Sequence, residues 1–265
     1  MQTKKLILTR DIVDKQGILM KKSVIIPSHI IDKENNIDYE ITAIESCVFE
    51  DDSILESIIL PNTIKRIGDY AFSNCINLKS INLPKGLLSI KPYTFNNCID
   101  LKNITFSEKL KTIGTCAFRK CRSLKKVKIP KSVTSIDSYA FKHSGLESFI
   151  HEQSDDLERV MIGKECFSGC DNLSEVIFSD NMKMLNTLTF SGCEKLEKLV
   201  LPKDLKTMHS SSIAFCKNLK EIYLPRYFQT MEENAIMDCP NITRIYWKGI
   251  SYPQEIAELK FKSHL

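Results

Sequence analysis

The stretch AFSNCINLKSINLP, Ala71–Pro84, is followed 46 residues later by AFRKCRSLKKVKIP, Ala117–Pro130. Midway between them lies a looser copy, TFNNCIDLKNITFS, Thr94–Ser107. All three place a cysteine three residues after a phenylalanine and a leucine three residues after the cysteine. Self-similarity at a short fixed period indicates a repeat architecture, in which each unit is completed by its neighbours.

One apolar position, here called the anchor, recurs along most of the chain at 23-residue intervals, except for one interval of 26 residues between Phe141 and Phe167. The anchors are Phe49, Phe72, Phe95, Phe118, Phe141, Phe167, Phe190, Ile213 and Ile236. Cysteine lies three residues after seven of them, at Cys75, Cys98, Cys121, Cys170, Cys193, Cys216 and Cys239. Leucine or isoleucine lies six residues after every anchor but Phe141, where Leu146 comes one residue early.

Within each unit, a short stretch such as Ile81–Leu83 alternates apolar and polar residues, which indicates a strand with one buried face. Proline follows at Pro84 and, because it cannot donate to a strand ladder, it ends the strand. Elsewhere an apolar residue recurs about every three positions, which predicts tight turns or short 3₁₀ pieces. One such unit cannot bury its apolar face alone. Stacked copies can, and the sequence therefore predicts a solenoid with a parallel sheet along one side.

The pattern LxxIxLP followed by xxVxxIxxxAFxxC resembles the BspA-like leucine-rich repeats. The matching residues are Leu78, Ile81, Leu83 and Pro84 in the strand half, and Ile64, Ile67, Ala71, Phe72 and Cys75 in the other half. The resemblance runs from about Val24 to Trp247. It implies an α/β-type, right-handed solenoid with its sheet on the concave face and turns on the convex face. It also implies a binding role, in a family with adhesin members and no shared catalytic residues.

We expect a single solenoid domain over residues 1–265, with an N-terminal cap at 1–36, nine repeats at 37–247 and a C-terminal cap at 248–265. In the N-terminal cap, Val24–Pro27 repeats the strand–proline signature and predicts a tenth, divergent strand. KKLILT and QGILM, at 4–9 and 16–20, are expected to form a hairpin that turns near Gly17. In the C-terminal cap, Ile256, Leu259 and Phe261 are expected to share one face of a short helix.

The composition is that of a globular protein, with 43% hydrophobic and 26% charged residues. A net charge of +4 is too small to indicate nucleic-acid binding, and no apolar run is long enough to span a membrane. The apolar core near the N-terminus stops at Leu8, too short for a secretory signal. We therefore expect a cytoplasmic protein or one whose signal has been removed, whereas the resemblance implies the cell surface.

Ten cysteines raise the question of disulfides or zinc. The seven ladder cysteines, those three residues after an anchor, point the same way into the core and lack the CxxC spacing of a zinc site. Buried, reduced thiols are the prediction, with Cys47, Cys116 and Cys166 also in the core. Neither a phosphate loop nor a catalytic motif is recognisable, and no cofactor is expected.

Two local features leave alternatives open. The long interval carries extra residues around 152–158, which suit a tolerated surface loop, a binding loop or a bend. His151 there lies near Asp155 and Asp156, so the same residues suit a solvated loop or a metal or acid–base site. Separately, Arg119–Lys131 contains seven basic residues and no acid, which suits a solvated basic ring or the binding of an acidic partner.

Outward-facing strand positions lie eight and ten residues after each anchor. In the C-terminal half the second column is apolar or aromatic, at Ile177, Val200, Tyr223 and Tyr246, and charged residues flank it at Glu175, Lys198, Glu221 and Arg244. These eight residues are the candidate site of a non-catalytic module that binds protein or glycan. The alternatives are a structural spacer in a surface array, for which the apolar residues merely suit strands, or an enzyme with a site in the irregular 141–167 repeat.

Overall fold

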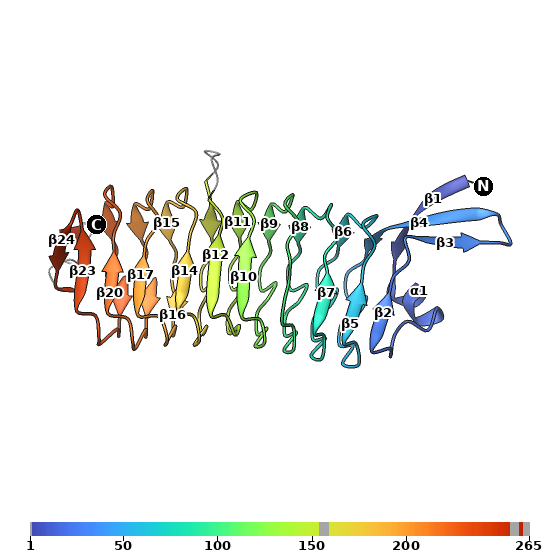
Figure 1. Ribbon diagram of the computed structural model, residues 1–265, viewed down its shortest axis with the longest axis horizontal. Helices are drawn as coiled ribbons and strands as arrows, with labels where there is room; N and C mark the ends of the chain where they lie inside the picture. Colours follow the sequence, from blue (N-terminus) through green and yellow to red (C-terminus); the bar gives the residue numbers. More distant parts are fainter. Residues whose placement is uncertain (1, 154–158, 255–259, 262–265) are drawn as a thin grey trace.

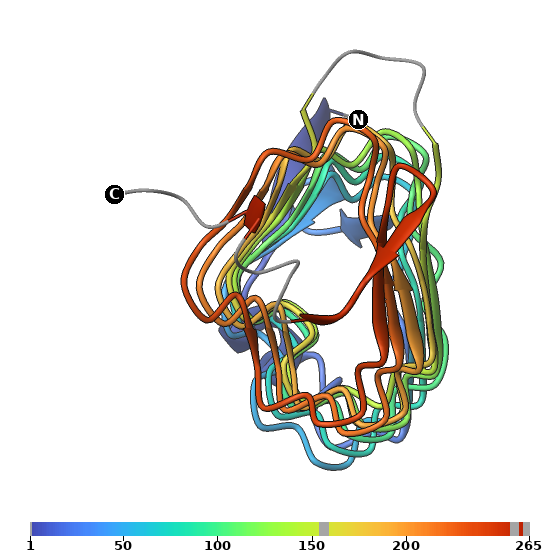
Figure 2. The ribbon, with the colours of Figure 1, turned by 90° about the vertical axis from the view of Figure 1, so that its left-hand side faces the viewer.

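The computed structural model describes residues 2–153, 159–254 and 260–261. About nine coils, each carrying one anchor, stack side by side into an elongated solenoid with the N-terminus at one end and the C-terminal coil at the other (Figure 1). Seen along the stack, the coils follow similar outlines (Figure 2). The predicted repeat solenoid with parallel sheets is confirmed.

The wall that carries the predicted strands consists of three parallel stretches. The first contains β2 (Ser23–Ile25), β5 (Ser57–Ile59) and β7 (Ser80–Asn82). The second contains β10 (Lys126–Ile129), β12 (Ser148–His151) and β14 (Glu175–Ile177). The third contains β17 (Lys198–Val200), β20 (Glu221–Tyr223), β23 (Arg244–Trp247) and the antiparallel β24 (Ile250–Tyr252). We call this wall the strand face.

A second wall is built from two-residue strands that end five residues before an anchor. They are β6 (Arg66–Ile67), β8 (Ser89–Ile90), β9 (Thr112–Ile113), β11 (Ser135–Ile136), β13 (Met161–Ile162), β15 (Met184–Leu185), β18 (Thr207–Met208) and β21 (Thr230–Met231). At the last three anchors, β16 (Phe190–Ser191), β19 (Ile213–Ala214) and β22 (Ile236–Met237) form a third ladder. Of the expected tight turns or short 3₁₀ pieces, the described residues form turns, together with these short strands, and no 3₁₀ piece.

The N-terminal cap differs from its prediction. β1 (Gln2–Leu8) pairs in parallel with β4 (Ile37–Ile44), and β3 (His29–Asp32) forms the hairpin with β4. The expected hairpin between KKLILT and QGILM is therefore wrong. Between them lies α1 (Arg10–Lys15), whose first turn is capped by the Thr9 hydroxyl as it accepts from the Ile12 amide. The divergent strand at Val24 is present as β2, in register with β5.

At the C-terminal end, β24 folds back on β23. Trp247 and Phe261 pack edge to face, with ring centroids 4.9 Å apart, and Phe228 meets Phe261 from another side. Phe261 is buried, as expected. Ile256 and Leu259, expected on the same helix face, lie outside the described residues.

The core is organised around the anchors, which stack from coil to coil. The seven phenylalanine anchors are fully buried, and their rings are nearly parallel, with neighbouring centroids 5.1–6.0 Å apart. The stack passes through the 26-residue interval, since Phe141 and Phe167 remain parallel at 6.0 Å. The extra residues therefore leave the anchor stack unbroken.

Each ladder cysteine has a specific partner. In six coils its Sγ–H donates to the carbonyl of the preceding phenylalanine anchor at 2.9–3.3 Å, as from Cys121 to Phe95 at 3.1 Å. Cys239 makes the longest such contact, 4.0 Å to Ile213. Burial raises the pKa values of the Cys98, Cys121 and Cys170 thiols, that of Cys170 to about 12. The geometry gives each thiol a backbone acceptor, and all ten cysteines are free.

Two residues in every coil adopt the left-handed backbone conformation, two positions before and two positions after the anchor. Those after it are Asp51, Asn74, Asn97, Lys120, His143, Gly169, Gly192, Phe215 and Asp238. Glycine, asparagine and aspartate tolerate this conformation best, and they fill six of these nine places. The paired reversals turn the chain sharply on both sides of the buried ring.

Replacing one anchor should destabilise the stack strongly. Phe118 is fully buried between Phe95 and Phe141, so Phe118→Ala should lower the free energy of unfolding by about 3–5 kcal/mol. Lys126→Ala, at an exposed strand position, should change it by no more than about 0.5 kcal/mol. Urea denaturation followed by circular dichroism measures both, and equal losses would contradict the assigned register.

The thiols should differ in reactivity according to burial. Cys47 is the one cysteine that is not buried, so a thiol reagent should modify it first in the native protein and reach all ten only in denaturant. In Cys47→Ser, the first modification of the native protein should be absent, as measured by mass spectrometry. Early modification of a ladder cysteine, or a mass loss of two per cysteine pair before reduction, would contradict the arrangement.

Candidate binding face

The candidate residues lie on the strand face, where the ladders fix their spacing. Val200, Tyr223 and Tyr246 are directly paired on adjacent strands, and Ile150 is paired with Ile177. We call Ile177, Val200, Tyr223 and Tyr246 the apolar stripe. The Ile177 and Val200 side chains are exposed, at 44% and 52%. β14 and β17 belong to different sheets, so the stripe has a break between Ile177 and Val200.

The two tyrosines form one rigid unit with a shared carboxylate. Their rings are stacked with centroids 4.4 Å apart and an interplanar angle of 12°. Glu221 accepts from both hydroxyls, at 3.0 Å from Tyr223 and 3.3 Å from Tyr246. Lys198, from the strand on the other side, places its ammonium 4.3 Å from the Tyr223 ring centre. Burial and the Glu221 carboxylate raise the pKa of Tyr223, so its hydroxyl stays protonated at neutral pH.

The remaining charged candidates are engaged at the margins. Arg244 donates to the Ser251 hydroxyl on β24 at 3.2 Å, and Glu175 accepts from the Ser148 hydroxyl. The structure therefore places all eight candidate residues on one face. It brings Tyr223, Tyr246, Glu221 and Lys198 into mutual contact and leaves the other four beside them.

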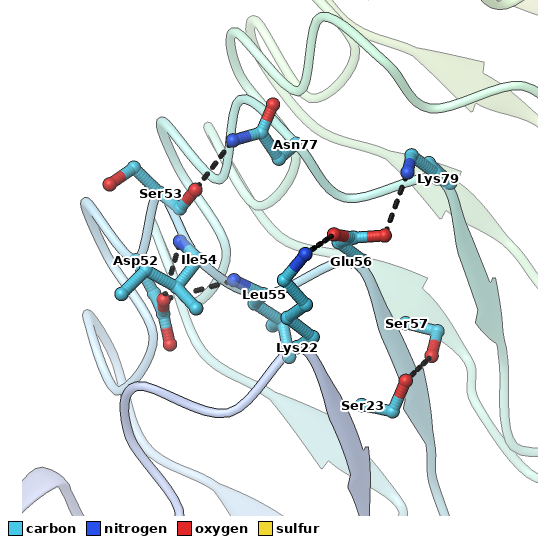
Figure 3. A network of polar contacts seen from close by, with 10 residues as sticks. All are labelled: Lys22, Ser23, Asp52, Ser53, Ile54, Leu55, Glu56, Ser57, Asn77 and Lys79. Atoms are coloured by element: carbon cyan, nitrogen blue, oxygen red, sulfur yellow. Dashed lines mark hydrogen bonds and ion pairs between the residues drawn. The ribbon is translucent and has the colours of Figure 1, made fainter.

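In the N-terminal part of the strand face, charged side chains form ion pairs with one another (Figure 3). Glu56 lies between Lys22 and Lys79, at 3.0 and 2.7 Å, and Ser57 donates to Ser23 on the neighbouring strand. Asp52, in the ladder-cysteine position of the first coil, accepts from two amides of its own turn. The Glu56 and Ser57 contacts connect successive coils, and the ion pairs neutralise the charges that Glu56 shares with Lys22 and Lys79.

The basic segment Arg119–Lys131 is partly neutralised. Lys125 pairs with Glu147 at 3.4 Å and Lys128 with Glu152 at 2.5 Å. The remaining basic side chains of this segment show no ion pair within the described part of the chain.

Sequence reasoning missed one exposed apolar residue of the face. Ile25 on β2 pairs with Ile59 on β5, and their side chains are 73% and 53% exposed. The signal was available in SVIIPS, because the inward Val24 places Ile25 outward by strand alternation. The outward column is therefore apolar at both ends of the solenoid and polar in the middle.

The structure gives no support to an acid–base site at His151. This side chain is 1% exposed, and among the described residues neither ring nitrogen has a hydrogen-bond partner. Asp155 and Asp156 lie outside the described residues. Among the described residues, no group of three or more His, Cys, Asp or Glu side chains could hold a metal ion. His151 pairs in register with Ile129 and occupies an inward, apolar position.

His151 should make folding sensitive to acid. Burial lowers the pKa of His151 from 6.5 to about 4. Between these pH values the imidazole is protonated in the unfolded chain and neutral in the folded protein. Stability should fall as the pH drops through this window, by about 3 kcal/mol in total. His151→Leu should remove this loss, and urea titrations of both proteins at pH 7.5 and 4.5 measure it. If the difference in unfolding free energy between the wild type and His151→Leu were the same at both pH values, the prediction would be wrong.

No helix in the described part of the chain is both long and apolar enough to cross a membrane. No curated protein matches the chain. The solved structures that resemble it include two leucine-rich repeat proteins at 29% identity. A leucine-rich repeat protein from Bacteroides ovatus is 29% identical, with a TM-score of 0.63 over 82% of this chain and 49% of its own. A leucine-rich repeat protein from T. pallidum is also 29% identical, with a TM-score of 0.59 over 72% of this chain and 83% of its own.

The chain thus spans about half the length of the Bacteroides ovatus protein. The family model for the BspA type leucine rich repeat region matches residues 42–159 and 156–263, in six copies. This match covers most of the chain and agrees with the anchors, the cysteine ladder and the stacked coils. The chain belongs to the BspA-type leucine-rich repeat family.

Proposed function

We propose that the protein is a non-catalytic binding module that recognises a protein ligand through the C-terminal part of its strand face. The observation that carries the proposal is the stacked pair Tyr223–Tyr246 with both hydroxyls fixed on Glu221. Right-handed winding and a concave strand face, which the family resemblance implies, are part of this proposal. An adhesin-like role at the cell surface would use the same face.

The tyrosine rings are pre-organised for binding. Tyrosine offers a large amphipathic surface at a low cost in conformational entropy, and binding hot spots are rich in it. Here the stacking and the Glu221 bonds restrict the rings before any ligand arrives, so little more is lost on binding. Exposed Val200 and Ile177 extend the apolar surface, and Lys198 and Glu175 lie at its margin. An apolar centre within a charged rim is the usual anatomy of a protein interface.

Protein is favoured over glycan by the orientation of the rings. Sugars typically stack on the open face of an aromatic ring. One face of Tyr223 is covered by Tyr246 and the other by the Lys198 ammonium. Tyr223 therefore offers its ring edge and hydroxyl, which suit the side chains and backbone of a protein.

The spacer alternative predicts a strand face without a distinctive patch. The N-terminal part, with its Lys22–Glu56–Lys79 chain of ion pairs, fits that description. The C-terminal part, with an aromatic pair and exposed aliphatic side chains, does not. This contrast within one face supports a binding role for the C-terminal part.

The stripe should matter for binding and not for folding. Tyr223→Ser together with Tyr246→Ser should shift the melting temperature by only a few degrees, because the rings lie outside the core. Peptides selected by phage display on the wild-type protein should bind this double variant at least about thirtyfold more weakly, since paired hot-spot residues each contribute about 2 kcal/mol or more. Isothermal titration calorimetry measures the affinity and differential scanning calorimetry the melting.

Ile59→Ser is the matched control, because it also removes an exposed apolar side chain from the outward column. It should bind the selected peptides with unchanged affinity. Wild-type affinity in the tyrosine double variant would overturn the proposal. Early unfolding of that variant, with normal binding at low temperature, would assign the tyrosines to the fold instead.

A further inference from the structure

The shortened fifth coil creates a hollow away from the strand face. In this coil Leu146 follows its anchor by five residues instead of six, so the turn after the anchor lacks one residue. Gly145 consequently packs against the fourth coil, where an added Cβ would lie 1.8 Å from the Arg122 carbonyl oxygen. No side chain other than glycine fits this approach. The missing residue leaves a hollow of about 430 Å³ bordered by the fourth, fifth and sixth coils. We call it the notch.

The notch interrupts a regular hydrogen-bond ladder. Asparagine five residues after an anchor donates its side-chain amide to a carbonyl of the preceding coil, at 2.6 Å from Asn77, 2.9 Å from Asn218 and 2.7 Å from Asn241. Asn172 occupies the same position in the sixth coil, but it makes no such bond within the described residues. Its amide therefore lines the notch unpaired, because the shortened coil offers it no carbonyl in register.

Charged side chains also reach the notch without pairing. Lys120 and Arg122 from the fourth coil and Asp171 from the sixth line it, together with His143. None of these side chains forms an ion pair or hydrogen bond within the described part of the chain. At other coils, some such charges pair with the neighbouring coil, as Lys217 does with Glu194 and Lys220 with Glu197. Burial, followed by the nearby cations Lys142 and Arg119, lowers the pKa of His143, so its ring is neutral at pH 7.

We infer that the notch is a binding site for an acidic sugar, with Arg122 and Lys120 holding the carboxylate and Asp171 and Asn172 holding ring hydroxyls. Arginine binds a planar carboxylate through two parallel hydrogen bonds. Asp171 accepts only, so it requires a ligand that also carries donors, which hydroxyl groups supply. Lys120, Arg122 and Asp171 sum to a charge of +1, which a single carboxylate neutralises. The volume lies within the range of small-ligand sites.

An acidic peptide fits less well. A glutamate side chain would satisfy Arg122 but carries no donor of its own, so only a backbone amide of the peptide could bind Asp171. A sugar instead presents several hydroxyl donors beside its carboxylate. A neutral sugar would leave Arg122 and Lys120 uncompensated. The mixed set of groups therefore favours a ligand that combines one negative charge with several hydroxyls.

The test uses the full chain and a tetrasaccharide of alternating glucuronic acid and N-acetylglucosamine, with titration followed by NMR or calorimetry. The wild-type protein should bind it, and neutral chitotetraose and tetraglutamate should bind at least tenfold more weakly. Arg122→Gln should weaken tetrasaccharide binding at least tenfold. Lys126→Gln, an equal loss of charge at an exposed position of the strand face, should leave it unchanged.

A second variant tests the origin of the notch. Insertion of one asparagine between Gly145 and Leu146 restores the regular length of the turn and should fill the hollow. It should keep the melting temperature and abolish binding. Equal binding by chitotetraose or tetraglutamate, wild-type affinity in Arg122→Gln, or retained binding in the insertion variant would each overturn the inference. The tyrosine double variant of the strand face should bind the tetrasaccharide normally, which separates this site from the proposed protein-binding face.

Discussion

The structure depends on the contact between one anchor and the next. Each phenylalanine ring stacks on its equivalent in the neighbouring coils, and the carbonyl of the same residue accepts the Sγ–H of the ladder cysteine 26 residues later in the regular coils. A single residue thus provides both apolar burial and a polar link between coils. Because most coils repeat this contact, the interfaces between coils contribute to stability as nearest-neighbour terms.

The exceptions in the cysteine position follow from this contact. The first coil has no preceding anchor whose carbonyl needs a donor, and there Asp52 accepts from the amides of Ile54 and Leu55 in its own turn. The fifth coil has Ser144, which lies 3.3 Å from the sulfur of Cys170. A buried polar group is costly unless it is hydrogen-bonded. Each substitution therefore comes with a partner suited to its place in the stack.

Much of the fold could be predicted because its determinants are periodic. The anchors, the inward strand residues and the outward column were readable from a 23-residue spacing, and the candidate residues did fall on one face. The N-terminal cap was not readable in the same way. Lys4–Leu8 pairs with Tyr39–Ile44, more than thirty residues away, and such a parallel pairing leaves no local turn signal. The helix between them did have a signal, since Thr9 before Arg10–Lys15 is a typical N-cap.

The finer geometry of the sites could not be predicted because it depends on side chains from different coils. The sequence placed Tyr223 and Tyr246 one unit apart, but their joint use of Glu221 depends on rotamers. Likewise, the early Leu146 was visible as an irregularity. Its consequence at Arg122 and Asn172 appears only when the neighbouring coils are in place.

Regular stacking itself limits where this solenoid can bind anything. In the regular coils, Asn77 bonds the preceding turn and Glu56 is shared between two lysines, so the polar groups of one coil are consumed by the next. Free recognition groups therefore arise in two ways. A coil of unusual length removes a partner, so that beside the fifth coil Asn172 and Arg122 have no side-chain partner among the described residues. Alternatively, an outward strand position carries an aromatic side chain, as at Tyr223, whose ring remains partly exposed beside Tyr246. The regular contacts between coils stabilise the solenoid, and binding sites therefore arise where the repeat is irregular. In this chain the two irregular features, the shortened fifth coil and the tyrosine pair of the strand face, lie on separate parts of the surface.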